Sequence, residues 1–275
     1  MKKTARLALS TCQWLAAIVA PAPAWPASFD EDFVVVYIDR QTEAKHGPLP
    51  LRRELLATGI ERIADAGARG LVMKFFFDLS SSSADDQHLA RAFSRMPTVL
   101  QARIDAGQTP SNPLPEHFSF AGDFDTAVAG AAGWLPLPQF ASAASDIGFV
   151  DFNTPVVPMI ERFQARYVKS LVLCAIELAA GQKMLFHPGH NIEVGPHTIP
   201  VDRKNQATAR LAQAPMQGSV SFNAVLDGSA QAIFKNKVVI LAYDGPHIDT
   251  FATPQGPMGA HRYFIHILRS LYDGA

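Results

Sequence analysis

Apolar runs of strand length alternate with helical periodicities through the first hundred residues. Residues 33–38 and 71–77 are such runs, and a third begins at residue 97. Residues 51–66 and 85–93, which separate the three runs, carry apolar side chains at helical spacing. The order strand, helix, strand, helix, strand predicts parallel strands joined by crossovers.

The same pattern returns near the end of the chain. Residues 238–242 form an unbroken apolar run, β-branched at its start, between a polar Lys-Asn-Lys segment and an Asp-Gly-Pro stop. Such a run predicts a strand buried on both faces. Residues 263–271 carry apolar side chains at helical spacing and predict a closing helix, reached through a long loop. Because ligands bind at the carboxyl ends of strands in open α/β sheets, we expect any site to involve this loop.

The middle of the chain is less regular. Residues 105–145 are rich in proline and small residues, and they predict an elaborated loop region with one short helix at 126–132. Further elements are predicted as strands over 147–151 and 163–167, a helix over 170–180, a hairpin of 192–194 with 198–201, and a short helix over 222–226. We therefore predict an α/β fold, a three-layer sandwich in which helices flank a mainly parallel central sheet.

The first 27 residues have the pattern of a secretory signal peptide. Positive charges precede a mostly apolar stretch, residues 7–20, and small residues follow at Ala24 and Ala27, where we expect cleavage. An uncleaved membrane anchor is the alternative, but prolines interrupt the segment and the apolar stretch is short for a span. We predict residues 1–27 as signal peptide, residues 28–275 as the mature domain, and a periplasmic or secreted location.

Composition narrows the class of protein. A hydrophobic content of 48% and a charged content of 18% fit a folded globular chain, and a net charge of −1 gives no indication of a nucleic-acid partner. The predicted mature chain keeps only Cys174, so it has no internal disulfide and must rest on its apolar core. The sequence contains no Gly-x-Gly-x-x-Gly motif, phosphate loop or Gly-x-Ser-x-Gly turn, so we expect no cofactor and no serine-hydrolase chemistry.

Short segments spread over roughly residues 33–271 carry a family resemblance when they are taken in order. They are residues 34–39 (Val-Val-Val-Tyr-Ile-Asp), 67–71, 86–93, 148–150, 199–202 (Ile-Pro-Val-Asp), 222–226 and 237–241, then Asp249, Thr253-Pro254 and Gly259. With these segments the chain resembles the type-two CHASE domain, an extracellular sensory module of bacterial cyclases and histidine kinases.

The chain departs from the family's pattern at several places. Lys74 stands where the family has an acid in its second strand, and residues 154–158 replace an Asp-Gly-x-x-Arg segment. The histidine of the family's closing helix falls at Tyr263. Family members usually continue into membrane spans and an output domain, whereas this sequence stops at Ala275. The resemblance therefore implies a free-standing, exported version with an altered pocket.

The function implied by the resemblance is that of a non-catalytic sensory module. Its partners would be an unknown small-molecule ligand and a membrane-bound signalling protein. The expected ligand-binding residues are Asp39, Lys74, Asp249, Thr253 and Tyr263.

A second class of function stays open from the residues themselves. Carboxylates at strand ends, together with a nearby histidine, are able to bind a cation. The alternative is therefore a metal-dependent periplasmic hydrolase that uses Asp39, Asp244, His247 and Asp249. The sensory reading is favoured because the resemblance supports it and no catalytic triad is visible.

Lys74 is a charged residue inside an apolar predicted strand. An ammonium group buried without a partner is costly, so the side chain must either reach water at a sheet edge or pair with a carboxylate. We expect pairing, because the first and second strands should be neighbours and would bring Asp39 close, while the last strand would bring Asp249 close. A lysine in place of an acid would also favour an anionic ligand group.

Overall fold

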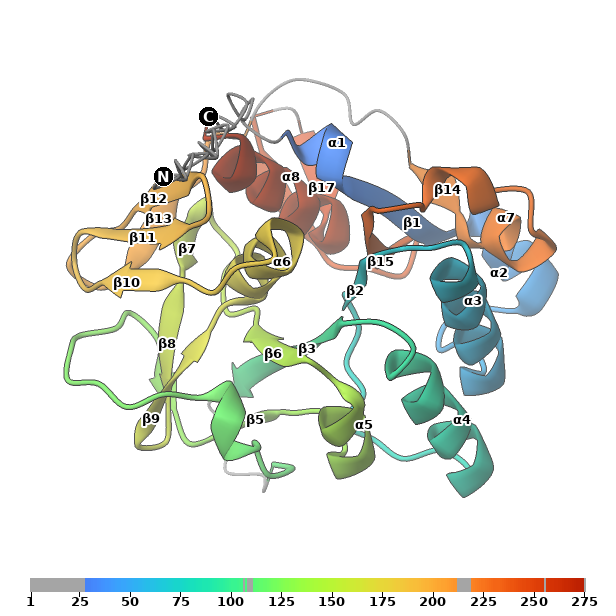
Figure 1. Ribbon diagram of the computed structural model, residues 1–275, viewed down its shortest axis with the longest axis horizontal. Coiled ribbons are helices and arrows are strands. Elements are labelled where there is room, and N and C mark those ends of the chain that lie inside the picture. Colours follow the sequence, from blue (N-terminus) through green and yellow to red (C-terminus); the bar gives the residue numbers. More distant parts are fainter. Residues whose placement is uncertain (1–27, 106, 108–110, 212–218, 255, 275) are drawn as a thin grey trace, which may run out of the picture.

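The computed structural model describes residues 28–105, 107, 111–211, 219–254 and 256–274, so the predicted signal peptide lies outside the described residues. Its centre is a seven-stranded sheet in the order β14-β1-β15-β2-β3-β5, in which β6 also pairs with β3 (Figure 1). These strands are β14 (Val220–Ser221), β1 (Phe33–Asp39), β15 (Val238–Asp244), β2 (Gly70–Met73), β3 (Thr98–Asp105), β5 (Ala132–Trp134) and β6 (Asp146–Phe149). Every pairing is parallel except that of β3 with β5, which confirms the mainly parallel sheet.

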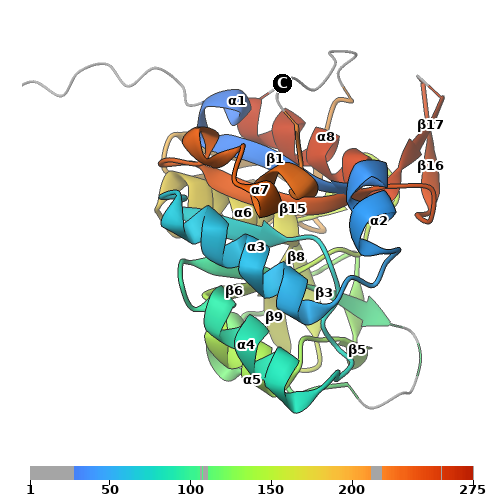
Figure 2. The same cartoon turned by 90° about the vertical axis from the view of Figure 1, so that its right-hand side faces the viewer.

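Helices cover both faces of the sheet, as the three-layer prediction requires. Alternate side chains of β1 point to opposite sides: Val35 and Tyr37 join one apolar core, whereas Val36 and Ile38 join the other. The first core contains α1 (Phe29–Asp32), α6 (Leu171–Ala180) and α8 (Ala260–Asp273). The second contains α3 (Arg53–Asp65), α4 (Ser83–Phe93), α5 (Pro138–Ala143) and α7 (Phe222–Asp227), and α3 and α4 lie in front of the sheet in Figure 2. A short helix α2 (Arg40–His46) follows β1.

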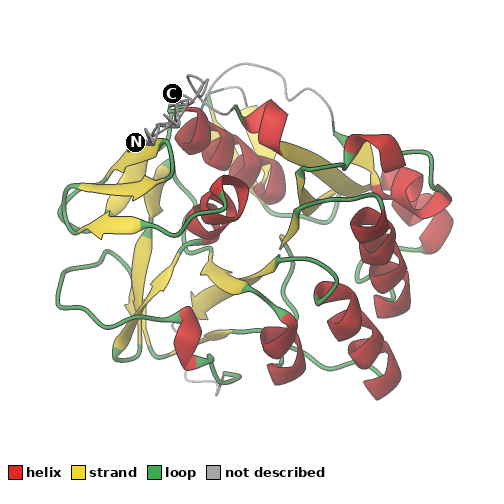
Figure 3. Ribbon diagram, viewed as in Figure 1, coloured by secondary structure: helices red, strands yellow, loops and turns green. Residues whose placement is uncertain are grey.

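Small accessory sheets lie beside the central sheet, mostly on the side away from α3 and α4 (Figure 3). They are built from β4 (Ala129–Gly130), β7 (Val156–Pro158), β8 (Ile160–Phe163), β9 (Arg166–Lys169), β10 (Leu185–His187), β11 (Asn191–Val194), β12 (His197–Pro200) and β13 (Gln206–Thr208). The predicted hairpin is confirmed as β11 and β12. The structure also contains two short 3-10 helices, Glu116–Phe118 and Gln231–Ile233. Within the described residues, no helix is both long and apolar enough to cross a bilayer.

The predicted helix at 126–132 is wrong, because this segment contributes to two strands, β4 and β5. Glycines in and directly after this segment allow close packing against β3. A Cβ atom at Gly130 would lie 2.3 Å from Ile104 Cγ2, and one at Gly133 would lie 2.2 Å from the Arg103 carbonyl oxygen, so only glycine allows β5 to pair with β3 there. A run of small residues is compatible with a helix, and the sequence alone does not show which backbone lies against it.

The predicted strand over 163–167 is wrong in its bounds, because it spans the turn of an antiparallel hairpin. β8 ends at Phe163 and β9 begins at Arg166, and Gln164 adopts a positive φ of 54° between them. Neither Gly nor Asn marks this turn, so the usual sequence signal is missing.

Three further expectations are corrected by the sheet topology. β2 ends at Met73 rather than continuing to residue 77. β1 and β2 are not neighbours, because β15 pairs in parallel with both of them. The long loop after β15 contains a hairpin of β16 (Thr250–Thr253) and β17 (Gly256–Gly259), which projects from the body of the protein in Figure 2. Strand order in a parallel sheet depends on tertiary packing, which the hydrophobic pattern does not encode.

Candidate ligand-binding site

A cavity of about 560 Å³ lies at the carboxyl edge of the sheet, where β2, β3, β6 and β15 end and α8 begins. Its lining combines six Phe, Trp and Tyr side chains and four aliphatic ones with seven polar or charged residues. The lining residues are Lys74, Phe76, Gln101, Arg103, Val128, Trp134, Val150, Asp151, Phe152, Asn153, Ile248, Asp249, Phe251, Ala260, His261, Tyr263 and Phe264. Ile248, Asp249 and Phe251 come from the segment after β15, so the cavity involves the loop that the sequence pointed to.

Two neighbouring strands bring the polar floor of this cavity together. Met73 of β2 is opposite Leu100 of β3, so the next residues along, Lys74 and Gln101, are opposite each other. Residues two apart on a strand share a face, which places Arg103 beside Gln101. Lys74 and Gln101 are 7% and 2% exposed, and the Lys74 ammonium donates a hydrogen bond to Gln101 Oε1. Lys74 Nζ also lies 5.1 Å from the centre of the Phe264 ring.

The expected ion pair of Lys74 is wrong. Its hydrogen-bond partner is the neutral amide of Gln101, and no ion pair joins it to a carboxylate of the described residues. The prediction failed because β15 separates Lys74 from the strand that carries Asp39. Burial, with a smaller effect of the positive charge of Arg103, lowers the pKa of Lys74 to about 7.

Asp151 lines the cavity beside Arg103, and the buried carboxyl group of Glu161 is its neighbour. Asp151 follows β6; its Oδ2 accepts a hydrogen bond of 2.9 Å from Ile104 N, and its Oδ1 lies 3.6 Å from Arg103 Nε. Burial raises the pKa of Asp151, and burial together with the Asp151 charge raises the pKa of the fully buried Glu161 well above its ordinary value. Both carboxyl oxygens of Glu161 are buried without a hydrogen-bond partner among the described residues, so the raised pKa favours its neutral, protonated form. Asp151 supplies the one negative charge beside Arg103.

The first turn of α8 closes the cavity with an uncharged imidazole. His261 Nδ1 accepts a hydrogen bond of 2.9 Å from Tyr243 N, which leaves the ring proton on Nε2. Burial, with a smaller effect of the Lys74 charge, holds the pKa of His261 well below its ordinary range. Tyr263, two residues further along α8, is buried and packs edge-to-face against Phe251 of β16, with ring centres 5.1 Å apart.

The structure brings together three of the five predicted site residues. Lys74, Asp249 and Tyr263 line the cavity, and Asp249 is exposed at its rim. Asp39 is elsewhere: its carboxylate caps α2 by accepting hydrogen bonds from Thr42 N and Oγ1, and it also accepts one from Ser221 Oγ. Thr253 lies on the β16–β17 hairpin, where its hydroxyl donates to the Gly256 carbonyl at 2.7 Å.

Sequence reasoning missed Gln101, Arg103, Asp151 and His261. The first two had a usable signal, because polar residues at alternate positions directly after an apolar run are typical of the end of a strand that faces a site. Only the beginning of the third strand was predicted, at residue 97; β3 runs from Thr98 to Asp105 and carries both side chains.

Two residues of the hydrolase alternative, Asp39 and Asp244, are opposite each other at the ends of β1 and β15, but both carboxylates are engaged by other partners. Asp244 forms a bidentate ion pair with Arg262, with its Oδ1 2.6 Å from Arg262 Nε, and Asp39 is engaged in capping. The described part of the chain contains no group of three or more His, Cys, Asp or Glu side chains placed to hold a metal ion.

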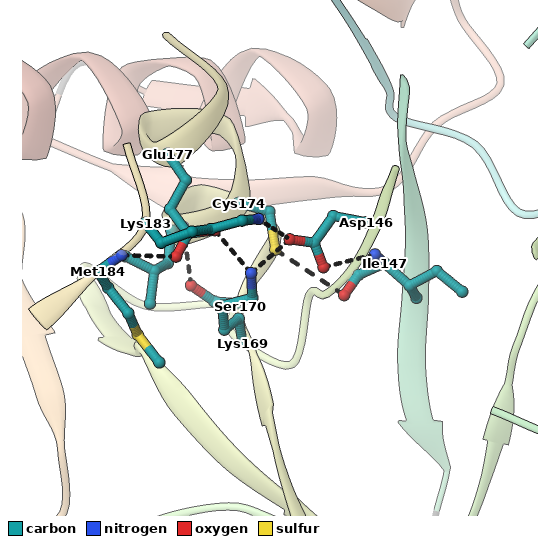
Figure 4. A network of polar contacts seen from close by, with 9 residues as sticks. Asp146, Ile147, Lys169, Ser170, Cys174, Glu177, Lys183 and Met184 are labelled. Atoms are coloured by element: carbon teal, nitrogen blue, oxygen red, sulfur yellow. Dashed lines mark hydrogen bonds and ion pairs between the residues drawn. The ribbon is translucent and has the colours of Figure 1, made fainter. Parts of the chain in front are cut away.

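A second polar cluster lies at the opposite, amino edge of the sheet (Figure 4). The buried Lys169 ammonium lies between Asp146, to which it donates, and Glu177, whose Oε2 accepts at 2.7 Å. The exposed Lys183 approaches the same two carboxylates at 3.2 and 3.1 Å, and Met184 N donates to Glu177 Oε1. Burial would lower the pKa of Lys169, but the neighbouring negative charges raise it above its ordinary value. The charges of this cluster are matched internally, which indicates a structural role.

Comparison with known proteins agrees with the resemblance seen in the sequence segments. The family model of the CHASE2 domain matches residues 4–273, which is nearly the whole chain. No curated protein and no solved structure matches. On the length of this match, the chain belongs to the CHASE2 domain family, a family of sensory domains.

Proposed function

We propose that this protein is an exported, non-catalytic sensory module that binds a small molecule in the cavity at the carboxyl edge of its sheet. The observation that carries the proposal is the composition of that cavity: buried Lys74 and Gln101 face a space of about 560 Å³ whose lining includes six Phe, Trp and Tyr side chains. Small-molecule sites are typically apolar cavities of this size with a few well-placed polar groups.

Helix α8 offers a physical link between the cavity and the far end of the domain. Its first turn lines the cavity, and its last turn holds α1, because Asp273 accepts a hydrogen bond of 2.7 Å from Phe29 N and the Tyr272 hydroxyl donates to Asp32 at 2.7 Å. A ligand that shifts the start of α8 would therefore move the contacts of α1. The proposed partner, a membrane-bound signalling protein, would read this end of the domain.

The cavity is tested by filling it. Ala260 is the first residue of α8 and lines the cavity, so Ala260→Phe should exclude ligands while it leaves the helix intact. Ala84→Phe, at an exposed position in the first turn of α4, is the matched control. A panel of neutral, anionic and cationic aromatic compounds is titrated by calorimetry. We expect at least one compound to bind the native chain and Ala84→Phe, with at least a tenfold loss in Ala260→Phe.

Two results would contradict ligand binding at this cavity. One is a panel in which no compound binds the native chain at millimolar concentration. The other is binding that Ala260→Phe leaves unchanged, which would place the site elsewhere.

Export is tested on the amino terminus of the protein itself. The basic, apolar and small-residue order of residues 1–27 leads us to expect cleavage after Ala24 or Ala27. The measurement is amino-terminal sequencing of protein recovered from the periplasm of an expressing bacterium. A chain that retains Met1 and stays in the cytoplasmic fraction would contradict export.

A further inference from the structure

We propose that the ligand of this cavity is an organic monocarboxylate with an aromatic body, whose carboxylate binds between the Lys74 ammonium and the Gln101 amide. This inference rests on the proposed function, because it names the class of molecule that the same cavity accepts. It is carried by the charges, the hydrogen-bond donors and the walls of the cavity.

The cavity has a single positive charge that the described residues leave unbalanced. Arg103 forms an ion pair with Asp151, and burial keeps Glu161 in its neutral form, so the positive charge of Arg103 is balanced. His261 is uncharged, and Asp249 is exposed to solvent at the rim, where water screens its charge. Lys74 is buried and has only a neutral partner. One ligand carboxylate supplies the missing charge, whereas a dianion would leave a charge of its own uncompensated.

Hydrogen-bond donors remain on the same floor of the cavity. An ammonium group has three N–H donors, and Lys74 uses one of them on Gln101 Oε1. Because the Gln101 oxygen accepts this bond, the NH₂ group of the same amide is the end that offers donors to a ligand. The amino end of α8, a fourteen-residue helix whose first residues line the cavity, adds a favourable potential for an anion.

Aromatic rings form the walls above this floor. Trp134 and Phe76 meet edge-to-face with ring centres 5.0 Å apart, and Phe152 and Phe264 form a stacked pair with ring centres 6.5 Å apart. All four line the cavity. Flat apolar groups pack well against such rings in offset or edge-on arrangements, so the walls fit an aromatic ligand body.

Binding of this ligand is coupled to a proton. In the ligand-free protein, burial and Arg103 bring the pKa of Lys74 to about 7, so its ammonium is lost as the pH rises above neutrality. A bound carboxylate favours the ammonium form, so binding above pH 7 takes up a proton and the affinity falls as the pH rises. The groups that face Lys74 are Arg103, which stays charged, and His261, which is uncharged over this range. Asp151 and Glu161 are the remaining titratable groups on this side of the cavity.

The experiment compares three probes of one shape on the full chain by calorimetry: 2-naphthoate, uncharged 2-naphthamide and the cation 2-naphthylmethylammonium. At pH 6.5 we expect naphthoate to bind at least tenfold more tightly than the amide, and the cation most weakly. Between pH 6.5 and 8.5 the naphthoate affinity should fall by about tenfold or more, as expected for a coupled proton with a pKa near 7. The amide affinity should stay constant.

Three variants assign the effect to Lys74. In Lys74→Met the preference for naphthoate over the amide should disappear, while retained amide binding shows that the cavity is intact. Glu161→Gln removes the titratable carboxyl group of Glu161, and the pH dependence should persist in this variant. Lys183→Met removes an exposed lysine of the other polar cluster and should change nothing.

The outcomes separate this inference from the proposed function. Naphthoate that fails to bind, or binds no better than the amide or the cation, overturns the monocarboxylate assignment. If another compound of the wider panel still binds the native chain and is excluded by Ala260→Phe, the cavity remains the site and only the ligand class is wrong. A pH dependence that survives in Lys74→Met and vanishes in Glu161→Gln also overturns the assignment.

Discussion

Replacing Lys169 by Met is expected to lower the free energy of unfolding by about 3–5 kcal/mol, the usual cost of removing one partner from a buried charge cluster. Lys169 is 11% exposed in its side chain, and it lies between Asp146 and Glu177, which are 8% and 3% exposed. Without the ammonium, two carboxylates face each other in a site that excludes water, with only an exposed lysine near them.

That exposed lysine provides the matched control. Lys183 approaches the same two carboxylates, but its side chain is 75% exposed. Exposed ion pairs contribute about 0–1 kcal/mol, so Lys183→Met should be nearly neutral. Urea unfolding of the two variants beside the native chain measures the difference. Equal effects of the two substitutions would show that burial of Lys169 does not determine the stability of the cluster.

Replacing Leu241 by Ala is expected to cost about 2–5 kcal/mol, because truncation of a fully buried leucine leaves a cavity in a packed core. Leu241 is 0% exposed on β15, which pairs with β1 on one side and β2 on the other. The side chain belongs to the core under α3 and α4.

Leu185→Ala is the control for this second substitution. Leu185 lies on β10 and is 57% exposed, and surface substitutions usually change stability by less than about 0.5 kcal/mol. Thermal or urea unfolding again provides the comparison. A loss at Leu241 as small as that at Leu185 would place β15 outside the core.

Leu241 and Lys169 also show how much of the fold could be predicted from the sequence. Leu241 lies in an unbroken apolar run, and burial on both faces is the direct physical reason for such a run, so its position was predictable. Lys169 sits in a short segment of mixed character, and a lysine is ordinarily expected at the surface. Its burial depends on Asp146 and Glu177, which are distant in the sequence and carry no shared pattern.

The candidate site was predictable in location but not in detail. The carboxyl edge of the sheet and the segment after β15 followed from general rules of α/β folds, and Lys74 was conspicuous as a charge within an apolar run. The partner of Lys74 was not predictable, because it depends on the order of the strands. β15, the last central strand in the chain, lies between β1 and β2 and keeps Asp39 away, while β3 brings Gln101 to Lys74.

The position of Trp134 allows ligand binding in the cavity to be followed by tryptophan fluorescence. The chain has three tryptophans, and the other two, Trp14 and Trp25, lie within the predicted signal peptide. Trp134 lines the cavity, is 43% exposed and has Arg103 5.6 Å from its ring centre. In a chain cleaved after Ala27, all indole emission would come from this one residue. Occupancy of the cavity would then be readable as a change in intrinsic fluorescence, with no attached dye and no engineered label.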